Sequence, residues 1–154
     1  MIRTEAEYNK ALERLENDRE TIRKQKEKLV EMNLEDEEIK RAIQPLQSFH
    51  DQLKEKVEVY EKMKRGDFGT LHSLNSIGRW LIGLRIVRGW TQAELAGKLG
   101  VTQAQVSGDE NNEYHGISVE KAQRILEVFG TNIKMELELE DPVTNGNQSN
   151  MALV

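Results

Sequence analysis

The chain opens with two long stretches in which apolar residues recur at alternating steps of four and three. Such spacing puts these residues on one face of a helix. The first stretch covers residues 4–31, where Thr4 and Glu7 have the spacing of a capping box. The second covers residues 36–64. Because each has an apolar seam and they are joined at 32–35, the pattern predicts an antiparallel helical hairpin or coiled-coil arm over residues 1–65. The seams are Tyr8, Leu12, Leu15, Arg19, Ile22, Lys26 and Leu29, then Ile39, Ile43, Leu46, His50, Leu53, Val57 and Tyr60.

Three residues within these two stretches weaken the pattern. Arg19 and Lys26 occupy seam positions, so the first helix must pack through their aliphatic stems or stay partly exposed. Pro45 lies inside the second helix and should bend or restart it, because proline removes an amide donor and clashes with the preceding turn. The alternative to a hairpin or coiled-coil arm is a solvated helical spacer with no partner.

A glycine-containing break at residues 66–70 separates the arm from a segment of different character. Apolar spacing and cap residues then predict a compact helical domain over residues 71–130. Its four expected helices cover residues 71–87, 91–99, 103–110 and 118–129.

After Gly130 the period changes from helical to two, which predicts a strand over residues 131–140. Its apolar face would carry Ile133, Met135, Leu137 and Leu139. The sequence offers no second alternating segment, so we expect this strand to pair with its own copy in a dimer. The alternative to self-pairing is that the strand docks on the arm or on a toxin. Residues 141–154 are expected to form a disordered tail. The predicted fold class is therefore mainly α, with one C-terminal strand.

Composition agrees with an elongated molecule. Apolar residues make up 37% and charged residues 32% of the 154 residues, with two Trp, three Tyr and three Phe, which is lean for a single compact core. No stretch reaches the roughly 18 apolar residues of a membrane span, and the first ten residues are charged where a signal peptide is apolar. Together with the absence of cysteine, this predicts a cytoplasmic protein.

The net charge of −5 is unusual for a nucleic-acid-binding protein, and its distribution matters. Residues 79–130 hold six basic and six acidic side chains, whereas residues 1–65 hold 15 and 16. Because Lys and Arg supply most non-specific DNA affinity, a neutral domain predicts weak non-specific binding.

The most informative segment is TQAELAGKLGVTQAQVSGDEN, residues 91–111. Thr91 can cap one helix, and Gly100 can end it in the left-handed conformation that turns the chain sharply. A wedge of apolar side chains then sets the angle to the next helix, which faces outward and can enter a major groove. The wedge consists of Leu95, Leu99, Val101 and Val106. The outward side chains are Gln103, Ala104, Gln105 and Ser107.

This segment, within residues 79–130, resembles the XRE or lambda-repressor-like helix-turn-helix family. The resemblance implies a structural ion pair between Arg85 and Glu110, and duplex DNA as the partner. It implies base reading at Gln103, Ala104 and position 108, and phosphate binding by Gln92. The full set of expected base contacts is Gln103, Ala104, Gln105, Ser107 and Gly108. The expected phosphate contacts are Thr91, Gln92, Thr102, Asn111 and Asn112.

The sequence departs from the family at position 108, where relatives carry a long polar or basic side chain. Gly108 offers no base contact, and a helix-interior glycine costs roughly 1 kcal/mol relative to alanine. Asp109 would repel phosphates. These residues indicate either altered DNA specificity or an adaptor that keeps the fold for protein contacts.

The opening segment IRTEAEYNKALERLE also resembles the start of HigA-like antitoxins. That resemblance implies a toxin-neutralising protein that represses its own operon. The second long helix, residues 36–64, exceeds what that family has.

The sequence gives little support for an enzyme. His50, His72 and His115 show no metal-ligand spacing, and no phosphate-binding glycine loop or activated nucleophile is present, so we expect no metal and no cofactor. Trp80 and Trp90 are expected in the core or at its rim. The remaining function classes are an operator-binding repressor, an interaction adaptor and a coiled-coil structural protein.

Overall fold

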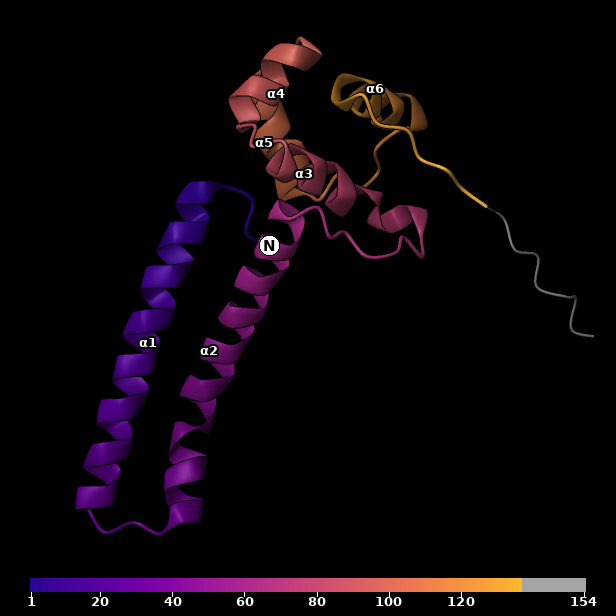
Figure 1. Cartoon of the computed structure of the whole chain (residues 1–154). Helices are drawn as coiled ribbons and strands as arrows, with labels where there is room; N and C mark the ends of the chain where they lie inside the picture. Colours follow the sequence, from indigo (N-terminus) through magenta and orange to yellow (C-terminus); the bar gives the residue numbers. More distant parts are fainter. Residues whose placement is uncertain (137–154) are drawn as a thin grey trace, which may run out of the picture.

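A computed structural model gives the fold and describes residues 1–136. Within them the elements are α1 (Glu5–Glu31), α2 (Asp36–Lys64), the 3₁₀ turn η1 (Leu74–Ser76), α3 (Ile77–Val87), α4 (Gln92–Leu99), α5 (Gln103–Asn111) and α6 (Val119–Phe129). We call residues 1–65 the arm and residues 74–136 the head. Figure 1 shows the long arm projecting from the small head. The predicted mainly α class is confirmed for this part of the chain. None of these helices is both long and apolar enough to cross a membrane.

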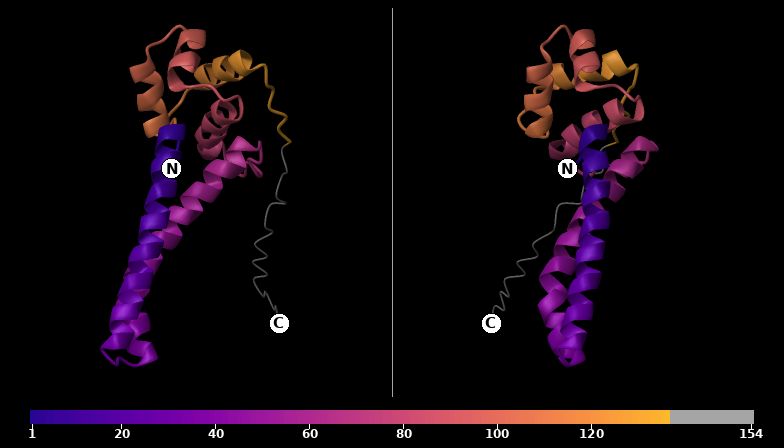
Figure 2. Two further views of the ribbon diagram at one scale, coloured as in Figure 1. Left: turned by 60° about the vertical axis from the view of Figure 1, so that its left-hand side comes forward. Right: turned by 90° about the vertical axis from the view of Figure 1, so that its left-hand side faces the viewer.

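The arm is the predicted antiparallel hairpin. The hydroxyl of Thr4 caps α1 by accepting a hydrogen bond from the Glu7 amide at 3.2 Å, and the two helices run side by side away from the head and back (Figures 1 and 2). Their facing sides bury a single narrow row of side chains. The row consists of Ala11, Ile22, Ile43, His50, Val57 and Tyr60.

Pro45 does not restart α2, which runs unbroken from Asp36 to Lys64. Proline removes one amide donor, but Ile43 and His50 on either side of it are buried. This packing outweighs one lost backbone bond, so the prediction of a restart was wrong.

The junction between arm and head is packed, although the sequence showed only a break there. Gly66 ends α2 at a φ of +80°, and the Asp67 amide then donates to the Lys62 carbonyl at 2.9 Å. Phe68 lies against α3 so closely that a Cβ on Gly83 would come within 2.5 Å of its ring. The arm is therefore joined to the head through a close contact.

The head is a four-helix unit around one apolar core. Its most deeply buried apolar side chains are Leu81, Ile82, Leu95, Val106 and Ile125. Gly78 of α3 lies so close to the loop after α5 that a side chain there would collide with the Glu113 carbonyl oxygen. Glycine at this position therefore permits the contact between helix and loop.

Two predicted elements of this region need correction. The helix expected over residues 71–87 begins later, because the Ser73 hydroxyl accepts from the Asn75 amide and starts η1, followed by α3. The strand expected over residues 131–140 is also wrong: residues 131–136 have no strand conformation. A strand needs a ladder partner, and residues 1–136 supply none. Ile133 packs on the head core instead, while Met135 is 66% exposed. Leu137, Leu139 and the expected tail, residues 141–154, lie outside the described residues.

Candidate DNA-binding site

Local capping fixes both helices of the predicted helix-turn-helix. Thr91 and Glu94 form a capping box on α4, and the hydrogen bond from the Thr91 amide lowers the pKa of the Glu94 carboxyl. Gly100 ends α4 at a φ of +69°, in the left-handed region. Thr102 and Gln105 then form a second capping box at the start of α5. The sharp turn between α4 and α5 thus follows from the residues that bound it.

The wedge between these helices is buried, with one exception. Leu95 and Val106 are at most 1% exposed and Leu99 is 6% exposed, whereas Val101 is 39% exposed. Three of the four expected wedge residues therefore set the angle between α4 and α5. Val101 lies at the rim because it follows the turn directly.

The outward face of α5 presents the expected base-reading residues to solvent. Gln103 and Ala104 are exposed, and Ser107 is half-buried. Gln105 is exposed too, but its Oε1 accepts hydrogen bonds from the Thr102 amide at 2.9 Å and the Thr102 hydroxyl at 3.1 Å. The side-chain amide of Gln105 is therefore engaged in capping α5.

Gly108 and Asp109 continue this face. A Cβ on Gly108 would meet nothing within 4 Å, so no packing constraint requires glycine. Asp109 pairs with Lys121 of α6 at 2.6 Å, and this cation offsets the repulsion that Asp109 would exert on a phosphate.

Most of the expected phosphate-binding residues are accessible. Thr91, Thr102 and Asn111 are exposed, and Asn112 is exposed with its Nδ2 donating to the His115 carbonyl at 3.4 Å. Gln92 is half-buried, and its Nε2 donates to Glu110 Oε2 at 2.9 Å. The first residue of α4 is thus tied to the end of α5.

Arg85 and Glu110 form the ion pair that the resemblance implies. Arg85 Nε lies 2.5 Å from Glu110 Oε1, and Nη2 lies 2.6 Å from Oε2. Their side chains are only 3% and 0% exposed. Arg85 Nη1 also donates to the Trp90 carbonyl at 2.8 Å. This bidentate pair joins α3, the turn before α4 and the last turn of α5.

One residue of this network, Arg3, was missed by the sequence analysis, as was the apolar contact of its neighbour Ile2. Arg85 Nη2 donates to the Arg3 carbonyl at 2.9 Å, and Arg3 Nη1 donates to the Glu110 carbonyl at 3.0 Å. The neighbouring Ile2 is 7% exposed and belongs to the same apolar cluster as the head core. No local pattern could have revealed these contacts, since Arg3 and Glu110 are 107 residues apart.

The aromatic side chains of the head pack on one another and on Phe68 of the junction. Trp90 stacks on Phe129 at a centroid distance of 5.0 Å, and Lys98 Nζ lies 4.5 Å from the Trp90 ring centroid. The ring centroids of Trp80 and Phe68 lie 6.3 Å apart. The two tryptophans therefore brace the domain.

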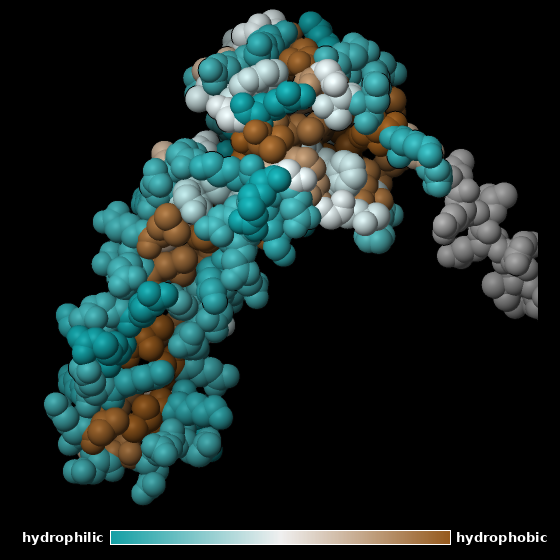
Figure 3. All heavy atoms as spheres, in the orientation of Figure 1, coloured by the Kyte–Doolittle hydropathy of each residue, from teal (hydrophilic) through white to brown (hydrophobic). Residues whose placement is uncertain are grey.

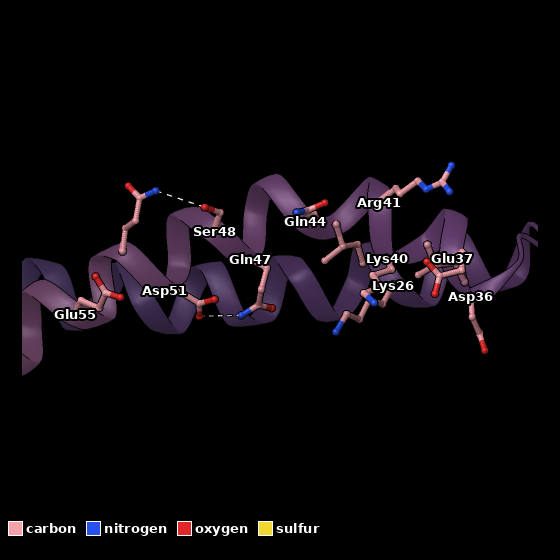
Figure 4. A pocket seen from close by; sticks show the side chains of 13 residues that line it. Lys26, Asp36, Glu37, Lys40, Arg41, Gln44, Gln47, Ser48, Asp51 and Glu55 are labelled. Atoms are coloured by element: carbon pink, nitrogen blue, oxygen red, sulfur yellow. Dashed lines mark hydrogen bonds between the residues drawn. The ribbon is translucent and has the colours of Figure 1, made fainter.

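Outside the head, a shallow hollow of about 710 Å³ lies near the far end of the arm. Figure 4 shows its charged side chains of both signs, all from α2 except Lys26 of α1, with Arg41 and Asp36 pointing away from the ribbon. Within residues 1–136, no group of three or more His, Cys, Asp or Glu side chains is arranged to hold a metal ion. The hollow is a solvated helix surface.

Comparison with protein families matches residues 81–134, about a third of the chain, to the family model described as helix-turn-helix. This segment is therefore a helix-turn-helix domain of the XRE type, a class of DNA-binding domain. Comparison with curated proteins gives no match. Comparison with solved structures gives none either.

Proposed function

We propose that the protein is a sequence-specific transcription regulator that reads duplex DNA through α5. The observation that carries this proposal is the exposed pair Gln103 and Ala104 at the start of a helix whose far end is anchored by the buried Arg85–Glu110 pair. A glutamine amide can donate to and accept from adenine, and an alanine methyl group can contact the thymine methyl. The fixed helix would present both groups in one register.

Phosphate binding at the start of α4 complements this reading. Amides at a helix N-terminus attract anions, and the Gln92 amide lies there, whereas the Thr91 amide donates to Glu94. Phosphate contacts position the protein, whereas base contacts give specificity. Because DNA is the partner, we place the protein in the cytoplasm.

We infer that the regulator acts as a repressor, because occupying an operator requires only the DNA-binding domain. An antitoxin role, with repression of its own operon, is supported by the resemblance of its first residues to HigA-like antitoxins. It is also supported by apolar side chains exposed on the arm, including Leu12 at 40%, Val30 at 60% and Phe49 at 69%. Figure 3 shows an apolar stripe along the arm, a surface suited to a protein partner.

We also infer a homodimer, because two recognition helices reading two half-sites compensate for the few base contacts of one α5. The surface that supports it is a groove of about 640 Å³ on the head. Leu74, Val119 and Met135, which are 62%, 80% and 66% exposed, border it. Light scattering should give a dimer for the wild type and a monomer for Val119→Glu. Val59→Glu, at an exposed position of α2, is the matched control and should remain dimeric.

A second candidate, an interaction adaptor with weak DNA binding, is favoured by Gly108 and by the balanced charge of residues 79–130. It keeps the fold but uses it for protein contacts. The two functions differ in whether a duplex is selected from a random pool.

The test is selection of duplexes from a random-sequence pool, followed by affinity measurements on the selected site and a scrambled duplex. Gln103→Ala should lose about 1–3 kcal/mol of discrimination at one base pair. Gln92→Ala should weaken binding to both duplexes nearly alike. Gln44→Ala, an exposed glutamine of the arm, is the control. Absence of any selected sequence would favour the adaptor, and equal losses for Gln103→Ala on both duplexes would contradict the reading role of α5.

A further inference from the structure

The first three residues of the arm are structurally part of the head. Ile2 is buried in the head's apolar cluster, although α1 itself leads away from the head. Arg3 is held at both its backbone and its side chain: its carbonyl accepts from Arg85, and its guanidinium donates to the Glu110 carbonyl. The position of the Arg3 side chain is therefore fixed by the head, which Figure 2 shows directly above the start of α1.

Arg3 and Gln92 meet at the same residue. Glu110 receives Gln92 Nε2 on its carboxylate at 2.9 Å and Arg3 Nη1 on its backbone oxygen at 3.0 Å. Gln92 is the first residue of α4, the helix start at which the proposed function puts a DNA phosphate. Arg3 and the first residue of α4 are thus linked through one shared residue, Glu110.

The Glu110 carboxylate is already neutralised by Arg85, with which it forms two hydrogen bonds. Arg3 therefore adds a positive charge that this carboxylate does not cancel. Arginine has five N–H donors, and the described contacts of the Arg3 side chain use one of them. The side chain is half-buried, so part of it faces solvent.

We propose that Arg3 is a phosphate-binding residue, supplied to the helix-turn-helix domain by the start of the arm. Its ligand is a phosphodiester of duplex DNA, which an arginine binds through paired N–H groups. This assignment rests on the proposed function. It gives the charge-balanced head a cation from a segment 107 residues away from Glu110. It also makes the arm a structural requirement for DNA binding, because Ile2 and α1 hold Arg3 in place.

The test separates phosphate binding from a purely structural role by the salt dependence of affinity. Arg3→Gln can still donate to the Glu110 carbonyl but carries no charge, whereas Arg3→Lys keeps the charge. Lys40→Ala, an exposed cation at the far end of the arm, is the control. Binding of a labelled duplex, selected by the wild type from a random-sequence pool, is followed by fluorescence anisotropy between about 50 and 200 mM salt.

Loss of one phosphate contact lowers the slope of log K against log salt by about 0.9. The affinity ratio of wild type to Arg3→Gln should therefore shrink about threefold over this salt range. Arg3→Lys and Lys40→Ala should keep the wild-type slope. A wild-type slope for Arg3→Gln, even with lower affinity, would overturn the proposal and leave the proposed function standing. Failure of the wild type to bind any duplex would overturn both.

Discussion

Head and arm use the same ionic chemistry in opposite environments. In the head, the Arg85–Glu110 side chains are 3% and 0% exposed, and the pair connects elements 25 residues apart. In the arm, Arg23 pairs with Glu20 and Glu27 within a single helix, and all three are about half exposed. The buried pair fixes tertiary structure, whereas the exposed pairs support only the helix on which they lie.

The same contrast applies to apolar burial. The head surrounds Leu81, Ile82 and Leu95 completely, whereas the arm has two helices and therefore encloses one row of side chains from two sides only. We infer that the head tolerates substitution less than the arm. Both tryptophans lie in the head, so Trp fluorescence reports its unfolding, while far-UV circular dichroism also reports the long arm helices.

The largest effect is expected for Arg85→Ala. Removing one partner leaves the Glu110 charge buried and uncompensated, which costs about 3–5 kcal/mol of unfolding free energy. Urea denaturation followed by Trp fluorescence measures this loss. Arg23→Ala in the arm is the control and should unfold like the wild type, because exposed pairs contribute little. Similar losses for both variants would refute the contrast between the two regions.

A second comparison lies within the head itself, between two glycines. Gly78→Ala should destabilise the head by about 1–3 kcal/mol or more, because the new Cβ collides with the Glu113 carbonyl oxygen. Gly97→Ala on α4 meets nothing within 4 Å and should stabilise the head by roughly 0.5–1 kcal/mol through helix propensity. Thermal melts of both variants measure these changes in stability. A stabilised Gly78→Ala would show that α3 and the loop after α5 can separate without cost.

The sequence predicted those parts of the molecule that local chemistry determines. Thr91, Gly100 and Gly130 mark helix ends because capping involves only neighbouring residues. The helix-turn-helix was found in this way, while the base-reading role of its exposed residues stays a prediction. The hairpin was found from its periodicity.

The parts that the sequence missed depend on long-range contacts or on competition between local contacts. Docking of Ile2 and Arg3 on the head brings together residues far apart in the chain, and no periodicity encodes it. The sequence analysis did not foresee that the Gln105 side chain bonds to Thr102; its expected base contact stays a prediction. Residues 131–136 alternate like a strand, yet alternation alone supplies no pairing partner.

In the arm, His50→Leu should raise stability by roughly 1 kcal/mol. His50 is 8% exposed, and its Nδ1 has no hydrogen-bond partner within the described residues. Burying an unsatisfied polar atom costs stability, and leucine removes that atom while filling a similar volume. Arg19, Lys26 and Gln47 border the same hollow, and their stems would contact the new side chain. Thermal melting by circular dichroism measures the gain, with the exposed His72→Leu as control. A lower melting temperature for His50→Leu would mean that the imidazole stabilises the seam.

The smallest effect concerns the contact between α1 and α2 at the end of the arm next to the head, and it depends on pH. The Glu5 carboxylate accepts hydrogen bonds from Lys64 Nζ at 3.0 Å and from the Tyr60 hydroxyl at 2.9 Å. These bonds, first that from Lys64 and then that from Tyr60, lower the pKa of Glu5 below its ordinary value of 4.5. Because the folded state has the lower pKa, the stabilisation is present above that ordinary value and is lost as the pH falls through the folded pKa.

Glu5→Gln should therefore destabilise the protein at neutral pH by roughly 0.2–1 kcal/mol, as expected of an exposed ion pair. The difference from wild type should close in acid, once the wild-type carboxyl is protonated. Thermal melts of both proteins at neutral and acidic pH measure this, and Glu13→Gln, on the exposed side of the same helix, should show no such dependence. A gap between wild type and Glu5→Gln that stays constant across the pH range would mean that Glu5 acts through its shape and neutral hydrogen bonds. The ends of α1 and α2 next to the head would then be held together by packing and not by charge.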